Sequence, residues 1–404
     1  MPVLVRFEAA APAVRSGSKA VAHGPVSLEK EMTVFSSPAF ADHEQVVFFY
    51  DRESGLRAIV ALHDTTLGPA VGGCRMWPYA TEADAITDVL RLSQGMTYKA
   101  ALAELPYGGG KTVIIGDPRS GKSAALFRAL GRAIESLDGR YYTGEDVGTS
   151  PTDMDWAGET TAYVLGRTRG GSGDPSPVTA RGVWLGIRAA VRHKLGRDDL
   201  AGIRVAVQGL GHVGYNLAKL LAQDGAQLIV ADLDAARAER AADEFGARCV
   251  DGAAILGVEA EVLAPCALGG VIDDATLPQL RCAVVAGAAN NQLLEARHGA
   301  ALHARGILYA PDYVINAGGL INIAQELEPG GYDRQRALQR VATIERTLTA
   351  IFDRARREDL PPSQIADRMA REQIEAARRR QPRRSQTSAR APALSPVPAS
   401  VALG

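Results

Sequence analysis

Two lysines and an acidic pair in the first half of the chain stand where they could carry out chemistry. Lys99 ends a helical pattern, and Lys111 follows three consecutive glycines just before a short apolar strand. Glycine runs let the backbone approach a ligand closely, and a lysine acts as a base when its pKa falls. Two ammonium groups in one site lower each other's pKa, so one could be neutral at about pH 8 while the other stays charged. Glu145 and Asp146 lie between glycines in the segment 143–149. From pattern alone, surface lysines and an ordinary turn remain an equal alternative.

A glycine-rich turn in the second half has the spacing of a dinucleotide-binding site. The predicted strand 203–208 runs into Gly-x-Gly-x-x-Gly and then into an apolar helix; the turn consists of Gly209, Leu210, Gly211, His212, Val213 and Gly214. The first glycine makes the turn, the second admits a pyrophosphate, and the third lets the helix pack on the strand. Asp232, at the end of the next strand, could bond a ribose 2′-hydroxyl and repel a 2′-phosphate, which favours NAD. Arg237 and Arg240 keep NADP open.

A second phosphate-loop pattern occurs in the first half. Residues 116–123 fit G-x-x-x-x-G-K-[ST], which is typical of nucleotide triphosphatases, with Lys122 as the phosphate-binding lysine. Two features weaken this interpretation. Pro118 has no N–H to offer a phosphate, and Asp117 places negative charge inside the proposed cradle. We therefore favour a simple helix start, and ATP binding would contradict that preference.

The hydrophobic periodicity predicts an α/β protein. Strands at 46–50 and 57–62 form an expected hairpin, followed by a helix at 82–96, a strand at 112–115 and a helix at 123–137. From residue 182 helices and strands alternate, which indicates a parallel sheet covered on both faces. Its expected helices are 182–195, 213–224 and 234–245, and its expected strands are 203–208, 227–231, 262–264 and 283–286. Residues 333–378 form two further helices, separated at Pro361-Pro362.

Composition narrows the class of protein. The 404 residues suggest two domains, and 45 basic against 46 acidic side chains give a net charge of −1, which argues against a nucleic-acid-binding protein. No apolar run is long enough for a membrane span, and the N-terminus does not resemble a secretory signal. The four cysteines lie far apart, without metal-ligand spacing, so we expect reduced thiols in a cytoplasmic enzyme without a metal. Residues 1–30 and 381–404 are expected to be disordered.

Seven motifs in one order resemble the amino-acid dehydrogenases that act on leucine, valine and phenylalanine, relatives of glutamate dehydrogenase. They are GPAVGGCRMWPY (68–79), GMTYKAA (95–101), GGGKTVIIGDP (108–118), EDVGTSPTDMD (145–155), APCALGG (264–270), AGAANNQL (286–293) and GILYAPDYVINAGGLI (306–321). The resemblance covers about residues 40–380. It implies a catalytic, substrate-binding and oligomerisation domain at 31–180, a Rossmann-type NAD domain at 181–325, and helices at 326–380 that return to the first domain. A cleft would separate the two domains.

The resemblance also implies a reaction, the NAD-dependent, reversible oxidative deamination of an L-amino acid to a 2-oxo acid and ammonia by a homo-oligomer. Lys99 matches the lysine that holds the substrate carboxylate, Lys111 the lysine that activates water, and Asp146 the aspartate that moves the amine proton. The backbone of Gly72 and Gly73 would lie beside the substrate carboxylate. Thr179 and Asn290 match contacts around the nicotinamide, and Asn290 would also reach the substrate.

The preferred amino acid follows less directly from the sequence. In the family that this chain resembles, enzymes with a glycine before the acidic pair and a leucine after NAGG act on aromatic substrates. Gly144 and Leu320 occupy these positions, so we expect a phenylalanine-like substrate, with leucine or valine as the alternative. The chain departs from the family at Cys74, at Ser150-Pro151 and at Gln325. Two further alternatives are a non-catalytic NAD-binding sensor and the triphosphatase; the intact lysines and Asp146 argue against the sensor.

Overall fold

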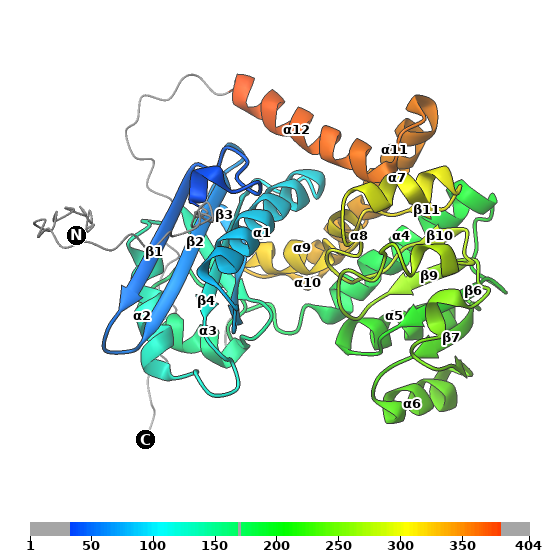
Figure 1. The fold of residues 1–404 in the computed structure, drawn as a ribbon, viewed down its shortest axis with the longest axis horizontal. Helices are drawn as coiled ribbons and strands as arrows, with labels where there is room; N and C mark the ends of the chain where they lie inside the picture. The colour runs from blue at the N-terminus through cyan, green and yellow to red at the C-terminus, as the bar shows by residue number, and fades with distance from the viewer. Residues whose placement is uncertain (1–32, 169–170, 381–404) are drawn as a thin grey trace, which may run out of the picture.

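The chain folds around two β-sheets, each with its own helices (Figure 1). The structure is a computed structural model that describes residues 33–168 and 171–380. The termini expected to be disordered lie outside the described residues. Of the helices in the described ranges, none is long and apolar enough to cross a membrane.

The first sheet is mixed, with the strand order β1-β2-β4-β3-β5. Its strands are β1 (Gln45–Asp51), β2 (Leu56–Asp64), β3 (Ala70–Trp77), β4 (Gly108–Ile115) and β5 (Tyr141–Glu145). The expected hairpin is confirmed, because β1 pairs antiparallel with β2. β3 pairs parallel with both β4 and β5. Three neighbouring strands therefore bring these residues to one part of the sheet: Gly72 lies on β3, Lys111 lies on β4, and Asp146 directly follows β5.

Helices cover both faces of this sheet. Ile59 and Val113 pack against α1 (Glu82–Leu102), whereas Val60 and Leu62 face the side covered by α2 (Ala124–Glu135). Because successive strand residues point to opposite faces, β2 is buried along almost its whole length. The short α3 (Pro151–Ala157) packs on α2.

The second sheet is parallel, with the order β11-β10-β9-β6-β7-β8, which confirms the predicted α/β class. Its strands are β6 (Arg204–Gln208), β7 (Gln227–Ala231), β8 (Arg248–Cys249), β9 (Val262–Pro265), β10 (Val284–Val285) and β11 (Leu308–Tyr309). The helices that accompany it are α4 (Ser176–Leu195), α5 (His212–Gln223), α6 (Ala235–Phe245) and α7 (Arg297–Ala304). The domain boundary expected at residues 180–181 falls inside α4, so a continuous helix crosses that point.

The C-terminal helices divide between the two halves of the molecule. They are α8 (Asp312–Ile315), α9 (Gly318–Ala324), α10 (Arg334–Val341), α11 (Thr343–Glu358) and α12 (Pro362–Arg380). α12 begins at the expected proline break and packs along α1, where Arg371 donates a hydrogen bond to the Tyr98 hydroxyl over 2.9 Å. α10 and α11 pack chiefly on α9 and α4. The expected return of residues 326–380 to the first domain is thus chiefly made by α12.

Candidate active site

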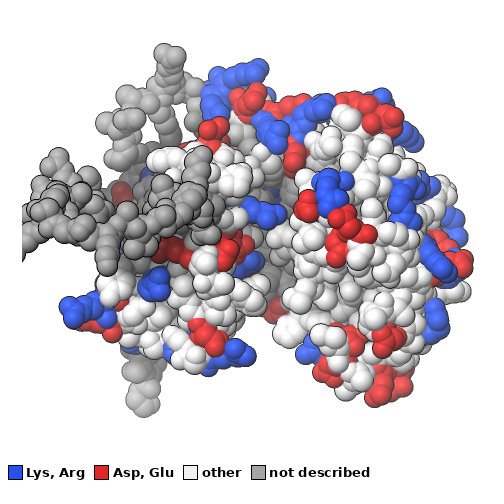
Figure 2. Space-filling model, in the orientation of Figure 1, with Lys and Arg blue, Asp and Glu red and all other residues white. Residues whose placement is uncertain are grey.

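A cavity of about 360 Å3 lies between the two sheets and their helices, and Figure 2 shows the groove between the two lobes on one face. Both halves of the chain line it. The predicted residues along its wall are Gly72, Gly73, Lys99, Lys111, Gly144, Asp146, Thr179, Val213, Asn290 and Leu320. Gly209, Leu210, Gly211, His212, Gly214 and Asp232 are not part of this wall. The fold therefore brings the predicted substrate-side residues together.

Lys111 and Asp146 form an ion pair within this cavity. The Lys111 Nζ and the Asp146 Oδ2 atoms are 3.0 Å apart, and only 5% of the Lys111 side chain is exposed. Burial by itself would raise the pKa of Asp146. The nearby ammonium of Lys111 and guanidinium of Arg75 outweigh this effect and lower that pKa to about 2. Asp146 is consequently an anion that is compensated by two cations.

Close strand contacts leave no room for side chains beside the two lysines. A Cβ atom on Gly72 would lie 1.8 Å from the carbonyl oxygen of Gly110, and one on Gly109 would lie 2.0 Å from the backbone nitrogen of Thr97. These positions need glycine because the neighbouring atoms are backbone and cannot yield. The backbone of β3 is left open to the cavity beside Lys99 and Lys111.

Lys99 differs from its expected state as a fixed cation. It comes from α1 and faces the cavity, and burial lowers its pKa to about 8; the Asp312 carboxylate opposes this shift, and Lys111 adds to it. Within the described ranges, no carboxylate pairs directly with the Lys99 ammonium. The physical reason is that burial removes water from the Lys99 ammonium, and Asp312 is not close enough to form an ion pair in its place. A bound carboxylate would supply an anion and favour the charged form.

The glycine-rich turn has the local geometry that a dinucleotide requires. Gly209 has a φ of +93°, which favours glycine, and a Cβ atom on Gly214 would lie 2.0 Å from the Gly209 carbonyl oxygen. A Cβ atom on Gly211 would meet nothing within 4 Å, so the backbone there is open to a ligand. α5 begins directly after this glycine, and its free N–H groups suit a pyrophosphate. Asp232 accepts a hydrogen bond from the backbone nitrogen of Leu210 over 2.6 Å, which places its carboxylate beside the turn. These residues fit a dinucleotide.

The second phosphate-loop pattern starts a helix. Ser123 caps α2 by accepting a hydrogen bond from the backbone nitrogen of Leu126, and Lys122 is paired with the buried Asp153 over 2.5 Å. The loop aspartate, Asp117, pairs with Arg119. The lysine that would hold a phosphate is thus neutralised by a protein carboxylate.

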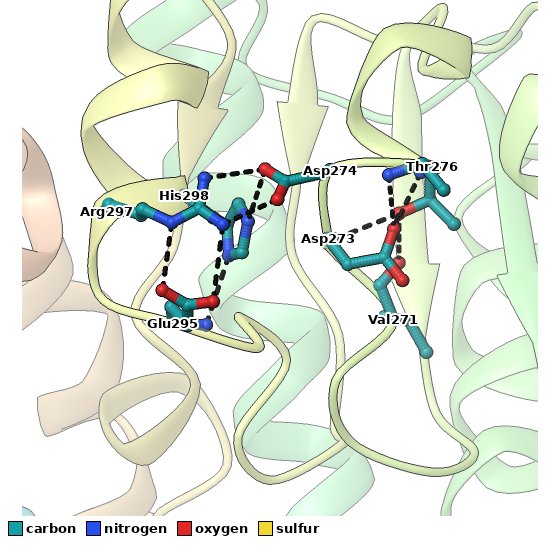
Figure 3. A network of polar contacts seen from close by, with 8 residues as sticks. Val271, Asp273, Asp274, Thr276, Glu295, Arg297 and His298 are labelled. Carbon is teal, nitrogen blue, oxygen red and sulfur yellow. Dashed lines mark hydrogen bonds and ion pairs between the residues drawn. The ribbon is translucent and has the colours of Figure 1, made fainter.

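A polar network stabilises the loops that follow β9 and β10. Figure 3 shows Arg297 bridging Asp274 and Glu295, with the buried His298 beside Asp274. Backbone bonds add to it, since the nitrogen of Gly270 donates to the carbonyl of Asn291 over 2.7 Å. The second of these loops carries Asn290, whose Oδ1 accepts a hydrogen bond from Asn316 over 2.7 Å. An irregular segment thereby holds Asn290 in a fixed place on the cavity wall.

Sequence reasoning missed several residues of the cavity, above all Arg75. Its Nε donates to Asp146 Oδ2 and its Nη1 donates to Asp88 Oδ2, both over 3.0 Å. Asp88 also accepts a hydrogen bond from the Tyr79 hydroxyl. Asn316 and Asp312, from the last motif, line the opposite wall. The available signal for Arg75 was a single charged side chain within the otherwise uncharged segment 68–77.

Two family models match this chain, one in each half. Residues 43–163 match the model for the Glu/Leu/Phe/Val dehydrogenase dimerisation domain, and residues 170–237 and 234–381 match the model for Glutamate/Leucine/Phenylalanine/Valine dehydrogenase. The chain belongs to this amino-acid dehydrogenase family. It is therefore an oxidoreductase with the two-domain α/β fold of that family. Within the described residues, no cluster of three or more His, Cys, Asp or Glu side chains could hold a metal ion.

Individual relatives of this amino-acid dehydrogenase carry three different substrate names. The leucine dehydrogenase of Geobacillus stearothermophilus is 53% identical over 350 residues, which cover 86% of this chain and 95% of that protein. The phenylalanine dehydrogenase of Bacillus thermotolerans is 46% identical over 361 residues, covering 88% and 94%. The crystal structure of L-tryptophan dehydrogenase from Nostoc punctiforme has a TM-score of 0.75 at 45% identity, covering 84% of this chain and 97% of that one.

Proposed function

We propose that this enzyme catalyses the reversible, NAD-dependent oxidative deamination of a branched-chain aliphatic L-amino acid, leucine or valine, to its 2-oxo acid and ammonia. The observation that carries the reaction is the meeting of Lys99, Lys111 and Asp146 on one cavity wall. The leucine dehydrogenases, at 52–55% identity, support an aliphatic substrate better than the phenylalanine dehydrogenases at 46–47%. The aromatic substrate that we expected is consequently the second candidate.

The surroundings of Gly144 give a physical reason for this revision. The absence of a side chain at residue 144 was expected to enlarge the substrate pocket by one methyl group. A Cβ atom placed there would lie 3.3 Å from the Cδ1 atom of Ile323, which also approaches Gly166. The Ile323 methyl group therefore borders the space beside Gly144 and limits how far it enlarges the pocket. Leu320 and Ile323 together present an aliphatic wall, and one methylene group changes discrimination by only about 1–3 kcal/mol.

The ribose-binding end favours NAD over NADP. The Asp232 carboxylate beside the glycine-rich turn would bond a 2′-hydroxyl and repel a 2′-phosphate. The two arginines that kept NADP open are engaged elsewhere. Arg237 pairs with Asp234, and Arg240 pairs with Glu244 and lies 4.3 Å from the centre of the Tyr215 ring. Neither is a free partner for a 2′-phosphate.

The residues of the cavity divide the chemistry among them. The Lys99 ammonium binds the substrate carboxylate by a charge-assisted hydrogen bond, beside the open backbone of Gly72 and Gly73. The glycine-rich turn, Thr179 and Asn290 would hold NAD, which would accept the hydride from the substrate Cα. Lys111, after losing its proton, takes a proton from the water that attacks the substrate iminium carbon. Asp146 takes a proton from the substrate ammonium before the hydride leaves and returns it to the departing ammonia. The surrounding walls exclude bulk water.

Initial rates with a panel of amino acids test this proposal directly. We expect leucine or valine with NAD to exceed phenylalanine and tryptophan in kcat/KM by about tenfold or more, as a methylene-scale difference permits. NADP should be a poor substitute. A higher kcat/KM for an aromatic substrate would select the second candidate. NADH binding without reduction of NAD by any amino acid would indicate a sensor, and ATP hydrolysis dependent on Lys122 would indicate the triphosphatase.

We also infer that the enzyme is a homo-oligomer in which β1 contacts a second copy of the chain. β1 is an edge strand of the first sheet (Figure 1), and it exposes Phe48 by 49% and Tyr50 by 73%. Exposed aromatic groups on an unpaired edge favour contact with another chain. The family model that covers β1 describes a dimerisation domain.

Charges on this strand should disrupt the oligomer. The double substitution Phe48→Glu and Tyr50→Glu should reduce the mass of the particle at least by half in light scattering, because like charges would face each other across the contact. Leu233→Glu is the matched control, since Leu233 is fully exposed at 101% on the second domain and its substitution should leave the mass unchanged. An unchanged mass in the double variant would place the interface elsewhere.

A further inference from the structure

Arg75 and Lys111 both form ion pairs with the carboxylate of Asp146. Its Nε and the Nζ of Lys111 each lie 3.0 Å from the same carboxylate oxygen, Oδ2. Both Arg75 and Asp146 have side chains that are only 17% exposed, so water screens these contacts little. The Arg75 guanidinium is in turn held by Asp88, on α1. The Oδ1 atom of Asp146 makes no hydrogen bond to any residue in the described ranges.

This arrangement addresses a difficulty in the proposed reaction. Lys111 must lose its proton to act as a base, yet an unshared Asp146 carboxylate 3.0 Å away would hold that proton firmly. Among the groups joined by these ion pairs, a charged Lys111 and Arg75 offset two carboxylates, Asp146 and Asp88. When Lys111 is neutral, Arg75 is the one cation in the described ranges that is ion-paired with them. Lys99, Asp312 and Glu145 act on this cluster from outside its ion pairs. Without Arg75, the neutral form of Lys111 would leave an uncompensated anion in a buried site, which is costly.

We propose that Arg75 is a positioning residue that shares Asp146 with Lys111, so that Lys111 can release its proton and Asp146 Oδ1 stays free for the substrate amine. The proposal rests on the proposed function and adds a residue to it. Arg75 acts through Asp146 and Lys111 and has no part in bond making. Asp88 holds the Arg75 guanidinium in place by accepting a hydrogen bond from it. The Tyr79 hydroxyl donates a hydrogen bond to the same Asp88 oxygen over 2.6 Å.

Other groups around Asp146 do not replace this contribution. Those that face it are Lys111 from β4, Arg75 and Cys74 from β3, Lys99 from α1, Tyr79 from the turn after β3, and Glu145 and Tyr141 from β5. Burial raises the pKa of the Cys74 thiol and of the Tyr79 and Tyr141 hydroxyls, which keeps these groups neutral. Lys99 is reserved for the substrate carboxylate. Arg75 is therefore the cation that offsets Asp146 when Lys111 is neutral.

The pH dependence of kcat/KM for amino-acid oxidation distinguishes this role from a structural one. In Arg75→Met, the pH at which the rate rises should move upward by about one unit or more, and the maximal kcat should fall about 10- to 100-fold. In Asp88→Asn, the cluster gains net positive charge, so the rise should move in the opposite direction, to lower pH. Arg75→Lys keeps the charge, and its profile should stay within about 0.3 unit of wild type.

Controls separate the failure of this proposal from other failures. Arg119→Met removes a guanidinium from an exposed ion pair with Asp117 and should change neither kcat nor the pH profile. NADH binding reports whether each variant is folded. If Arg75→Met does not bind NADH, the pH profiles of kcat/KM for Arg75→Lys and Asp88→Asn test the proposal instead. The proposal would be overturned if the pH profiles of Arg75→Met and Asp88→Asn moved in the same direction, or if neither moved. A wild-type enzyme that oxidises no amino acid would instead overturn the proposed function.

Discussion

Replacing Lys111 by methionine should lower kcat at least about 1,000-fold while NADH binds as it does to the wild type. Loss of a general base typically costs about 10²–10⁴ in rate, and the Lys111 ammonium also compensates Asp146. Methionine is unbranched and only one atom shorter than lysine, so the strand β4 should keep its packing. The glycine-rich turn and Asp232 belong to the other sheet and do not depend on Lys111. Single-turnover rates and titration of NADH fluorescence measure the two effects separately.

Lys122→Met provides the matched control for this substitution. Lys122 is also paired with a buried aspartate, Asp153, over 2.5 Å, but it does not line the cavity. Its replacement should reduce thermal stability because a buried carboxylate loses its partner, with kcat within about twofold of wild type. Activity of Lys111→Met above a tenth of the wild-type value would remove Lys111 from the role of base.

Most of the second sheet could be predicted from the sequence because four of its six strands have a local signal. β7 was expected at 227–231 and occupies those residues. Its side chains from Leu228 to Ala231 are buried on both faces, so they form a continuous apolar run between two turns. β8 and β11 have two residues each, which is too short for a periodic signal, and the sequence did not reveal them.

The first sheet was harder to predict because its strands serve the site as well as the fold. β3 contains two glycines and Arg75, which interrupt the apolar run, and only its pairing with β4 and β5 makes it a strand. β4 begins at Gly108, four residues before the expected start. Glycines weaken a strand prediction, yet here they permit the close approach of α1 at Gly109. The glycines that obscure the apolar strand pattern are thus the residues that expose the backbone to the cavity.

The motifs located Lys99, Lys111 and Asp146, but the partners of these residues depend on the tertiary structure. Arg75 is 71 residues from Asp146 in the chain, and nothing in the spacing connects them. The lowered pKa of Lys99 likewise follows from burial without a paired anion, a property of the assembled cavity. The sequence thus indicated the groups that we propose to react, and the fold shifts the pKa values of Lys99 and Asp146.

The charge of Lys99 leads to the prediction with the second largest effect. Replacing Lys99 by methionine should raise the KM for the amino acid about 100-fold, with a smaller change in kcat. A charge-assisted hydrogen bond to a buried carboxylate contributes about 1.5–3 kcal/mol, and the unpaired substrate anion adds a desolvation cost. NADH affinity should not change. Steady-state rates over a range of amino-acid concentrations give both constants.

The pH dependence of substrate binding gives an independent measure of the same contact. Burial lowers the pKa of Lys99 to about 8, so the ammonium is present below this pH and is lost as the pH rises through it. Wild-type affinity for a carboxylate should therefore fall above about pH 8, and the binding of that carboxylate should raise the pKa of Lys99. In Lys99→Met this alkaline decrease should be absent.

Two competitive inhibitors separate the carboxylate contact from general damage to the site. 4-Methylpentanoate keeps the carboxylate of leucine without its amine, and 3-methylbutylamine keeps the amine without the carboxylate. If Lys99 binds the carboxylate, Lys99→Met should lose about 100-fold in affinity for the acid and little for the amine. Equal losses for both inhibitors would mean that the substitution distorts the cavity as a whole. Retained affinity for the acid would assign the carboxylate to another group, and Lys111, Arg75 and Arg91 are the other cations on the cavity wall that could receive it.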